Sequence, residues 1–481
     1  MKKLAGLIII LAALVLGGYY VTGYLTEKNI RKNVEAIDKT NASKVAIKEY
    51  KRGWFTSDAV FDTQMHFPEQ TISSADGQVK KIPAQDYNLE LPIRIYHGPV
   101  ILSHGKVHFG LGYAESVIPF PKQYDADFNT VFTEQSQKPQ LDLSLFVNFL
   151  NQSTFNAEVP AFNLFGKADN LRINWLGLDV KNTMTPEMDK LNGGMYLKGV
   201  QVSKQDMNAD LDKLTVDYDL KLLPSGLYIG RGDFLLPALK VEAQGKKLIE
   251  LSNLDFKSGS DIHDNLLNTH LDLTLQSLFA QDRSYGPGEL KLAIRNLDAD
   301  ILARINKQTA GMQNATDLQR QQALIAVLPE IPKVFAKGAE LEISKFDLKL
   351  PQGVMEGNLF IQLPVEDSAN PLMMMQKIHG KGHLKVPAAA VREVFQKSVM
   401  QQMAKQPEYQ QALTQELTPP GATPAPGAEQ LAAMQADKQL NLLQQNGLVV
   451  AQGSDFVLDM TLEQGKLMVN GKPFDASMLK F

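Results

Sequence analysis

The sequence predicts a mainly β protein with α elements: an N-terminal transmembrane helix followed by an extended antiparallel β-sheet domain with inserted helices. Three observations predict this fold class. Residues 4–26 carry no charge and follow two lysines, apolar and polar residues alternate along many later segments, and only short breaks rich in Gly, Pro, Asn or Asp separate those segments. Because parallel pairing needs longer crossovers between neighbours, the short breaks favour antiparallel strands.

Residues 4–26 are long enough to cross a bilayer, since a helical span of a hydrocarbon core of roughly 30 Å needs about 20 residues. Lys2 and Lys3 mark residues 1–3 as a cytoplasmic tail, and tyrosines near the far end of the span suit the opposite interface. A cleaved secretory signal is the alternative, but the apolar run is long for a signal and no Ala-x-Ala-like site follows it. We therefore expect a single-pass anchor in a bacterial inner membrane, with the C-terminal domain in the periplasm.

The composition excludes several classes of protein. The chain has 481 residues, of which 44% are hydrophobic, so it can bury a substantial core. Its net charge of -4 and the lack of a dense basic stripe argue against nucleic acid as a partner. It has no cysteine, which excludes disulfides, thiol nucleophiles, cysteine-ligated zinc and a lipid carried on cysteine.

Residues 27–44 are polar, with Ile30, Val34 and Ile37 at helical spacing, and predict a helical stalk beyond the anchor. From residue 45 to residue 481 the sequence predicts a periplasmic β-rich domain, because the apolar period changes to two. The alternating segments are 60–67, 141–149, 171–180, 214–223, 270–278, 289–294, 340–350, 358–365 and 455–474. Within the last of them, residues 463–465 predict the turn of a hairpin.

Three helices are expected to interrupt the strands. Residues 298–337 predict the first, with Asp298 or Asp300 as its N-cap. Residues 387–417 predict the second, because apolar residues recur there at intervals of four, and residues 429–446 predict the third. The Pro-rich residues 418–428 between them predict a surface loop.

Residues 50–59, YKRGWFTSDA, carry a family resemblance, together with His97-Gly98-Pro99 and the closing residues 465–473, GKLMVNGKP. On these motifs the chain resembles the YdgA/YihF-type family, bacterial envelope proteins of uncharacterised function. Thr56 stands where that family more usually has Ser. The resemblance implies a periplasmic protein anchored in the inner membrane, and it implies no reaction.

The same motifs supply the candidate site residues, which are Gly53, Trp54, Phe55, His97, Gly98 and Pro99. We interpret them as a structural or recognition motif. Gly53 permits a bend between two strands, and the rings of Trp54 and Phe55 are expected to cover a core edge. The alternative is that Trp54 is exposed and recognises a partner.

Catalytic patterns are scarce. His104 and His108 are expected on one face of a strand, about 13 Å apart and so too far to share a metal ion. Ser260, His263 and Asp264 lie in SGSDIHD, which we interpret as a polar turn rather than a catalytic triad. Phosphate-binding and dinucleotide-binding glycine motifs are absent from the sequence. We therefore predict no enzyme, and no catalytic, metal-binding or cofactor-binding residues.

Two functions from different classes remain. In the first, an apolar sheet face binds a hydrophobic envelope component such as a lipid and serves envelope maintenance, and the methionines of residues 373–375 are candidates to line it. In the second, the protein is a non-enzymatic scaffold or accessory factor that binds another envelope protein. Alternating strands also suit a closed core without a groove. The expected partners are the inner membrane, a lipid or an envelope protein, and a second copy of the chain in a homodimer.

Overall fold

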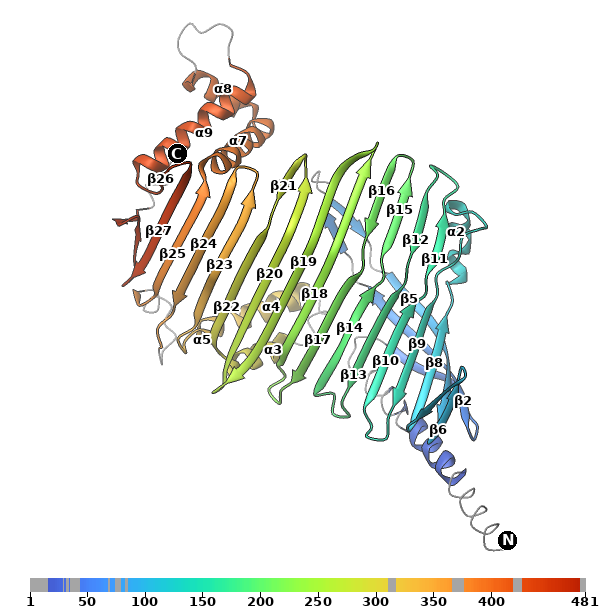
Figure 1. Ribbon diagram of the computed structural model, residues 1–481. Helices are drawn as coiled ribbons and strands as arrows, with labels where there is room; N and C mark the ends of the chain where they lie inside the picture. The colour runs from blue at the N-terminus through green and yellow to red at the C-terminus, as the bar shows by residue number, and fades with distance from the viewer. Residues whose placement is uncertain are drawn as a thin grey trace, which may run out of the picture. The chain divides into compact units, whose positions relative to one another are not determined.

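The computed structural model describes residues 16–28, 30–31, 34, 44–67, 70–73, 79–82, 85–309, 317–365, 376–417 and 426–475 (Figure 1). It divides into two compact units. Unit 1 consists of Met1–Phe234, Lys240–Lys246 and Ala303–Leu328, and unit 2 consists of Leu235–Leu239, Lys247–Leu302 and Pro329–Phe481. Both are built on antiparallel strands, which confirms the predicted mainly β fold with an extended antiparallel sheet and helices.

Each principal strand of unit 1 pairs antiparallel with the next principal strand along the chain. They are β1 (Lys44–Arg52), β2 (Thr56–Phe67), β5 (Gln85–His97), β8 (Gly112–Ile118), β9 (Leu141–Val147), β10 (Ser153–Val159), β13 (Leu178–Met184), β14 (Lys190–Leu197) and β17 (Leu214–Leu222). The shorter strands are β3 (Gln70–Ser73), β4 (Val79–Ile82), β6 (Val100–Ser103), β7 (Lys106–Phe109), β11 (Phe162–Phe165), β12 (Arg172–Trp175), β15 (Val200–Lys204) and β16 (Met207–Leu211). β18 (Tyr228–Ala243) has residues in both units.

Unit 2 repeats the same architecture, again with antiparallel neighbours. Its principal strands are β19 (Lys246–His263), β20 (Leu266–Ala280), β22 (Gly288–Asp298), β23 (Glu340–Leu350), β24 (Gly353–Gln362), β25 (His379–Pro387), β27 (Asp455–Glu463) and β28 (Lys466–Val469). The shorter ones are β21 (Arg283–Tyr285), β26 (Val450–Gln452) and β29 (Lys472–Pro473). The predicted hairpin turn is confirmed, since Glu463 pairs with Lys466 and the two residues between them have positive φ.

The predicted helix over 298–337 is three helices in the structure: α3 (Ala299–Thr309), α4 (Asp317–Val327) and α5 (Ile331–Val334). Asp298 is the cap of the first, because its Oδ1 accepts the backbone N–H groups of Asp300 and Ile301, each at 3.0 Å. The short helices η1 (Lys122–Tyr124) and α2 (Asp125–Val131) were not predicted. One turn or two is too short to show a helical period in a sequence.

Unit 2 also contains a helical cluster. The predicted helix over 387–417 is α7 (Ala388–Lys405) and α8 (Pro407–Leu417), which separate at Gln406 because a proline cannot donate the next backbone hydrogen bond. α9 (Ala428–Gln445) packs against both. These three helices share one buried core, which consists of Val399, Met403, Leu413, Leu431 and Ala432. The Pro-rich residues 418–425 lie outside the described residues.

Residues 16–28 form a helix, which we call the N-terminal helix. Residues 4–15 of the predicted anchor, most of the predicted stalk and the methionines of residues 373–375 lie outside the part of the chain that the structure describes. Within that part, no helix combines the length and the apolar character that crossing a membrane requires.

Candidate functional site

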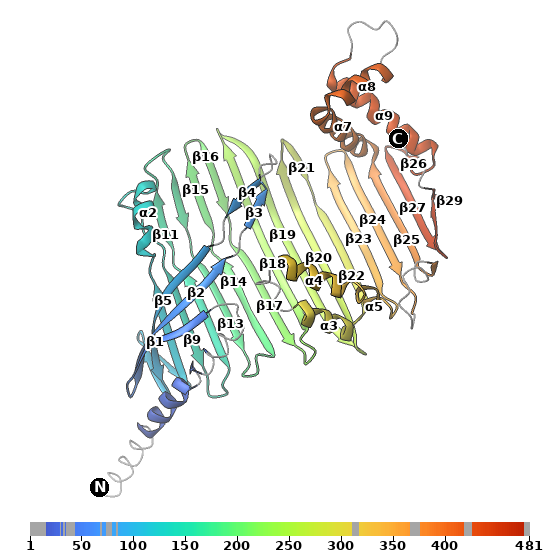
Figure 2. The same ribbon diagram turned by 180° about the vertical axis from the view of Figure 1, so that it is seen from behind.

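The structure brings the two sequence motifs of the candidate site together in unit 1. The turn between β1 and β2 contains Trp54 and Phe55, and the register of β2 with β5 pairs Thr56 with Tyr96. The turn therefore lies beside His97 at the end of β5, and the backbone N–H of His97 donates to the carbonyl of Phe55 at 2.8 Å. Figure 2 shows β1, β2 and β5 next to the N-terminal helix.

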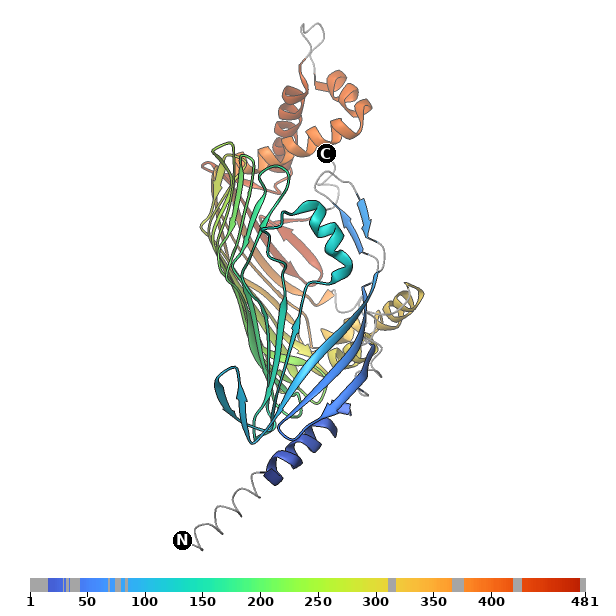
Figure 3. The ribbon, with the colours of Figure 1, turned by 90° about the vertical axis from the view of Figure 1, so that its right-hand side faces the viewer.

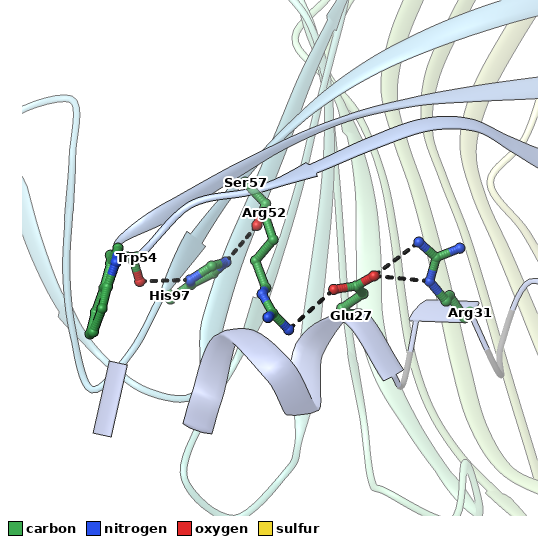
Figure 4. A network of polar contacts seen from close by, with 6 residues as sticks. All are labelled: Glu27, Arg31, Arg52, Trp54, Ser57 and His97. Carbon is green, nitrogen blue, oxygen red and sulfur yellow. Dashed lines mark hydrogen bonds and ion pairs between the residues drawn. The ribbon is translucent and has the colours of Figure 1, made fainter. Parts of the chain in front are cut away.

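His97 is the centre of this site (Figure 4). Its Nδ1 lies 3.0 Å from the carbonyl oxygen of Trp54, and its Nε2 lies 2.9 Å from the hydroxyl of Ser57. A carbonyl only accepts, so Nδ1 carries the proton and Nε2 accepts the Ser57 hydroxyl. Burial lowers the pKa of His97, although the backbone hydrogen bond to Trp54 opposes that shift, so the ring is neutral at pH 7.

A serine hydroxyl bonded to a neutral histidine has the form of a nucleophile and its base. In this protein the side chains of Ser57 and His97 are each only 1% exposed. Both groups are therefore closed to solvent in this structure. We call His97, Ser57 and Trp54 the His97 cluster.

The N-terminal helix closes over the His97 cluster. Thr22 Oγ1 lies 2.8 Å from the carbonyl oxygen of Gly98, and the hydroxyl of Tyr19 donates to the carbonyl of Val100. Gly23 faces the imidazole so closely that a Cβ there would lie 2.6 Å from His97 Nδ1. Gly98 is equally constrained, because a Cβ on it would lie 1.8 Å from the carbonyl oxygen of Gly110. The candidate site is thus the surface on which this helix docks. We call this surface, which includes His97, Gly98 and Val100, the socket.

Trp54 and Phe55 do not cover a core edge, and that expectation was wrong. Their side chains are 57% and 52% exposed, because both sit in a turn beyond the edge of the sheet. Each ring still contacts the N-terminal helix: Phe55 packs edge-on against Tyr19 at 4.8 Å between centroids, and Trp54 lies 5.9 Å from Tyr20. The aromatic turn therefore has one face on the helix and one face free.

A basic cavity lies further along the same helix. Its volume is about 550 Å³, and its lining residues are Tyr24, Glu27, Lys28, Arg31 and Arg52. Glu27 bonds Arg31 at 2.9 Å and lies 3.5 Å from Arg52 (Figure 4). The Arg52 guanidinium also lies over the rings of Tyr20 and Tyr24. Three cations and one carboxylate give this cavity a net positive charge.

The predicted arrangement of the other histidines was wrong. His104 lies in the turn between β6 and β7, not on a strand, because Gly105 beside it completes a two-residue turn of positive φ. Its Nε2 lies 2.9 Å from a carboxylate oxygen of Glu115, while His108 stacks on Tyr113. Within the described residues, no three His, Cys, Asp or Glu side chains are placed to hold a metal ion.

The segment SGSDIHD is not a polar turn, except at its last residue. Residues 258–263 belong to β19, and only Asp264 and Asn265 turn the chain into β20. Ser260 and His263 are three positions apart on a strand, so their side chains leave opposite faces of the sheet. They do not form a triad.

One hollow in unit 1 was not predicted from the sequence. It has a volume of about 510 Å³ and a lining of mixed charge that includes Lys181, Asp217, Arg231 and Asp233. The hydroxyl of Tyr196 donates to Asp217 within it, and this bond raises the pKa of Tyr196. The available signal was the pair Gly193-Gly194 inside an alternating segment, because glycines leave a sheet face without side chains.

Comparison with known proteins gives a family and no activity. The model of a family described as "Bacterial protein of unknown function (DUF945)" matches residues 1–477. The chain is 20% identical over 477 residues to "Protein YdgA" of Escherichia coli (strain K12), a match that covers 87% of this chain and 90% of that protein. The resemblance found in the sequence is therefore confirmed.

Proposed function

We propose, on the premise that the chain belongs to the DUF945 family of bacterial proteins, that it binds a hydrophobic component of the cell envelope, such as a lipid, on apolar sheet faces. The proposal includes the predicted inner-membrane anchor and a periplasmic location for both units. One observation carries it: neighbouring strands in each unit, β9, β10, β13, β14 and β17 in unit 1 and β20, β22, β23 and β24 in unit 2, align apolar residues in rows that are left partly exposed.

In unit 1 the register aligns apolar residues across five neighbouring strands. One row is Leu143, Ala157, Val180, Met195 and Val216. Although β9, β10, β13, β14 and β17 are described throughout, they contain no buried apolar side chain. Within the described part of the chain, most of these side chains are therefore partly exposed rather than buried.

In unit 2 the same pattern is found. One row is Leu271, Leu292, Ile343 and Leu359, and another is Leu273, Leu290 and Phe346. The alternate residues on the opposite face are charged and form ion pairs across strands, such as Lys345 with Glu289 at 2.6 Å. A solvated charged face and an apolar face thus lie on the two sides of one sheet.

In unit 2, apolar residues that pack against a helix can be compared with apolar residues of neighbouring strands on the same face. Where α9 lies against β27 and β28, Phe456, Val469, Leu440 and Leu443 are buried in one cluster. The apolar residues of β20, β22, β23 and β24 belong to the same face pattern, and none of them is buried. Contiguous apolar surface of this kind marks a binding site for a ligand, a membrane or a protein.

Site-specific photocross-linking in cells tests the proposal. We would place benzoylphenylalanine at Val216 of unit 1 and Leu273 of unit 2, with Asp217 and Asp272 as matched controls one residue away on the opposite face. Lipid adducts, identified by mass spectrometry, are expected from the two apolar positions and not from the two controls.

The same experiment decides between the two candidate functions. Adducts to one reproducible envelope protein from Val216 and Leu273, without lipid, would replace lipid binding by the scaffold function. Equal adducts from both members of each pair would show that contact is unspecific, and would also contradict lipid binding on the apolar face.

A further inference from the structure

In unit 1 the antiparallel register places the turns at two opposite edges of the sheet, which are formed by the ends of the strands. Arg52 pairs with Ser57, His97 with Gly112, Val147 with Ser153, and Met184 with Leu191, so the connections after β1, β5, β9 and β13 leave the same edge. We call this edge the unit 1 rim. It consists of residues 53–55, 98–111, 148–152 and 185–189.

Large apolar side chains project from every turn of the unit 1 rim. Leu150 is 75% exposed, Leu102 is 69% exposed and Phe109 is 65% exposed. The complete set is Trp54, Phe55, Leu102, Val107, Phe109, Phe149, Leu150 and Met188. Isolated exposed apolar residues are ordinary, but a series on successive turns of one edge is not.

The turns that carry these side chains are hydrogen-bonded structures. Asn148 Oδ1 accepts the backbone N–H groups of Leu150 at 2.9 Å and Gln152 at 3.0 Å, which fixes the turn that exposes Phe149 and Leu150. The turn that exposes Met188 is closed by the bond from its N–H to the Thr185 carbonyl at 3.0 Å. The exposed side chains are therefore presented in defined positions.

The N-terminal helix joins this same rim. Through Thr22 and Tyr19 it is bonded to Gly98 and Val100, which begin the β6–β7 hairpin of the rim. Figure 3 shows the helix and that hairpin at one end of unit 1. The helix contains the last residues of the uncharged segment 4–26, so a bilayer that holds this segment comes directly to the rim.

Charge at the rim agrees with this position. The cavity lined by Lys28, Arg31 and Arg52 lies on the same helix, at the level where the uncharged segment ends. Cations at that level attract the phosphates of anionic lipids, and aromatic rings such as that of Trp54 favour the headgroup region.

We propose that the unit 1 rim inserts its apolar turns into the surface of the lipid bilayer and holds the sheet edge-on against the membrane. This surface is distinct from the sheet faces of the proposed function, and it does not require that they bind cargo. It rests on the predicted anchor for its proximity to a bilayer. The contact is a series of side chains reaching the headgroup and upper acyl region, without a further membrane span.

The chain provides its own probes, because it contains two tryptophans. Trp54 is on the rim, whereas Trp175 lies on β12 and stacks on Phe162. We would reconstitute the full-length variants Trp175→Phe and Trp54→Phe in nanodiscs whose phosphatidylcholine is brominated near the top of the acyl chains. Quenching of Trp54 fluorescence to about half or less is expected, with Trp175 unchanged.

A second series separates insertion of the whole rim from simple tethering by the helix. In a chain with both tryptophans replaced by Phe, a tryptophan is introduced as Leu150→Trp or Met188→Trp on the rim, and as Met207→Trp on the opposite edge. Met207 is exposed and lies roughly 40 Å along the strand direction from the rim, so it is the matched control.

Quenching at Leu150→Trp and Met188→Trp but not at Met207→Trp supports the proposal. Quenching limited to Trp54 shows that only the helix meets the bilayer, and it overturns the proposal. Equal quenching at all positions, including Met207→Trp, indicates collapse onto the lipid and overturns it as well. Circular dichroism of each variant establishes that the sheet is intact, and none of these outcomes depends on whether lipid adducts form on the sheet faces.

Discussion

Gly23 and His97 are in contact across the socket, and the space between them limits what the N-terminal helix tolerates. A Cβ at Gly23 would lie 2.6 Å from His97 Nδ1 and 2.7 Å from Cε1. The imidazole cannot move aside without losing its bonds to Trp54 and Ser57. At Gly18, five residues earlier, the nearest atom to a Cβ is Pro99 Cδ at 3.7 Å, an ordinary contact.

We expect Gly23→Ala to release the N-terminal helix from the socket at a cost of about 1–3 kcal/mol, the usual range for an overpacked contact. Hydrogen exchange of residues 16–28 in the full-length protein measures this release. Gly18→Ala is the matched control and should slow exchange slightly, because alanine favours helix by up to about 1 kcal/mol. Equal exchange in the two variants would contradict the close contact at His97.

His97 makes the docking of the helix sensitive to acid. Burial holds its pKa in the folded protein below the ordinary value of 6.5. The ring therefore binds a proton at a higher pH when it is exposed than when it is buried. The stabilisation is therefore complete above pH 6.5 and is lost as the pH falls through the lower, folded value.

Exchange of residues 16–28 should accordingly rise by up to about tenfold per pH unit between pH 6.5 and 5.5, after correction for intrinsic rates. His97→Gln keeps a polar side chain but does not titrate, so its corrected exchange should be higher at neutral pH and flat in this interval. A wild-type protein with flat corrected exchange would mean that the ring is charged or exposed when the helix is docked.

At the scale of elements, α7 is tied to the β-hairpin that contains β21. Both carboxylate oxygens of Glu393 lie 2.6 Å from Arg283 Nη1, and Lys397 and Gln352 also bond this carboxylate. The hydrogen bond from Arg283 and then that from Lys397 lower the pKa of Glu393 to about 2, from an ordinary value of 4.5. Stability from this group is present above pH 4.5 and is lost as the pH falls toward 2.

Glu393→Gln should lower the unfolding temperature of the protein by roughly 2 °C at pH 7, a small effect because partly exposed ion pairs contribute little. The difference from wild type should shrink between pH 4.5 and 2, where the wild-type carboxylate takes up its proton. Glu408→Gln, on α8, removes a charge from the same helical cluster and serves as the control. A difference that stays constant with pH would contradict the lowered pKa.

Elements in which a repeating pattern continues over many residues were predictable from the sequence. Elements whose ends are determined by single residues were not. Alternation over seven or more residues located β9, β17 and β20, because a sheet with one apolar face imposes a period of two on each strand. The break at Pro407 is hidden within a continuing apolar stripe. Residues 258–263 resemble a turn because Ser, Gly and Asp favour turns locally, whereas the pairing of β19 with β20 determines their conformation.

The residues of the candidate site were predictable from the sequence, but the packing of the N-terminal helix on them was not. The two motifs, Gly53-Trp54-Phe55 and His97-Gly98-Pro99, meet as one site because of the pairing of β2 with β5. No local pattern in the sequence specifies that pairing, or that Gly23 would pack on His97. The exposure of Trp54 was not predictable either, because the sequence does not distinguish a buried aromatic residue in a turn from an exposed one.

At the scale of the whole molecule, the orientation of the chain across the membrane decides whether both proposals apply. If residues 1–3 are cytoplasmic and residues 4–26 span the inner membrane, everything after residue 27 is periplasmic. Alkaline phosphatase fused after Asn41 should then be active, because that enzyme folds only where its disulfides form. A fusion after Lys3 is the control and should be inactive. An inactive fusion after Asn41 would contradict the topology and, with it, both proposals.

The partly exposed apolar faces of both units also affect how the protein responds to temperature. Globular proteins gain about 12–15 cal/mol/K of heat capacity per residue on unfolding, because apolar groups that were dry become hydrated. The apolar side chains of β9, β10, β13, β14 and β17 in unit 1, and of β20, β22, β23 and β24 in unit 2, already meet solvent in the folded protein without a ligand. Its heat-capacity increment per residue should lie below that range and its stability curve should be correspondingly flat, until an occupant dries these faces and restores the curvature.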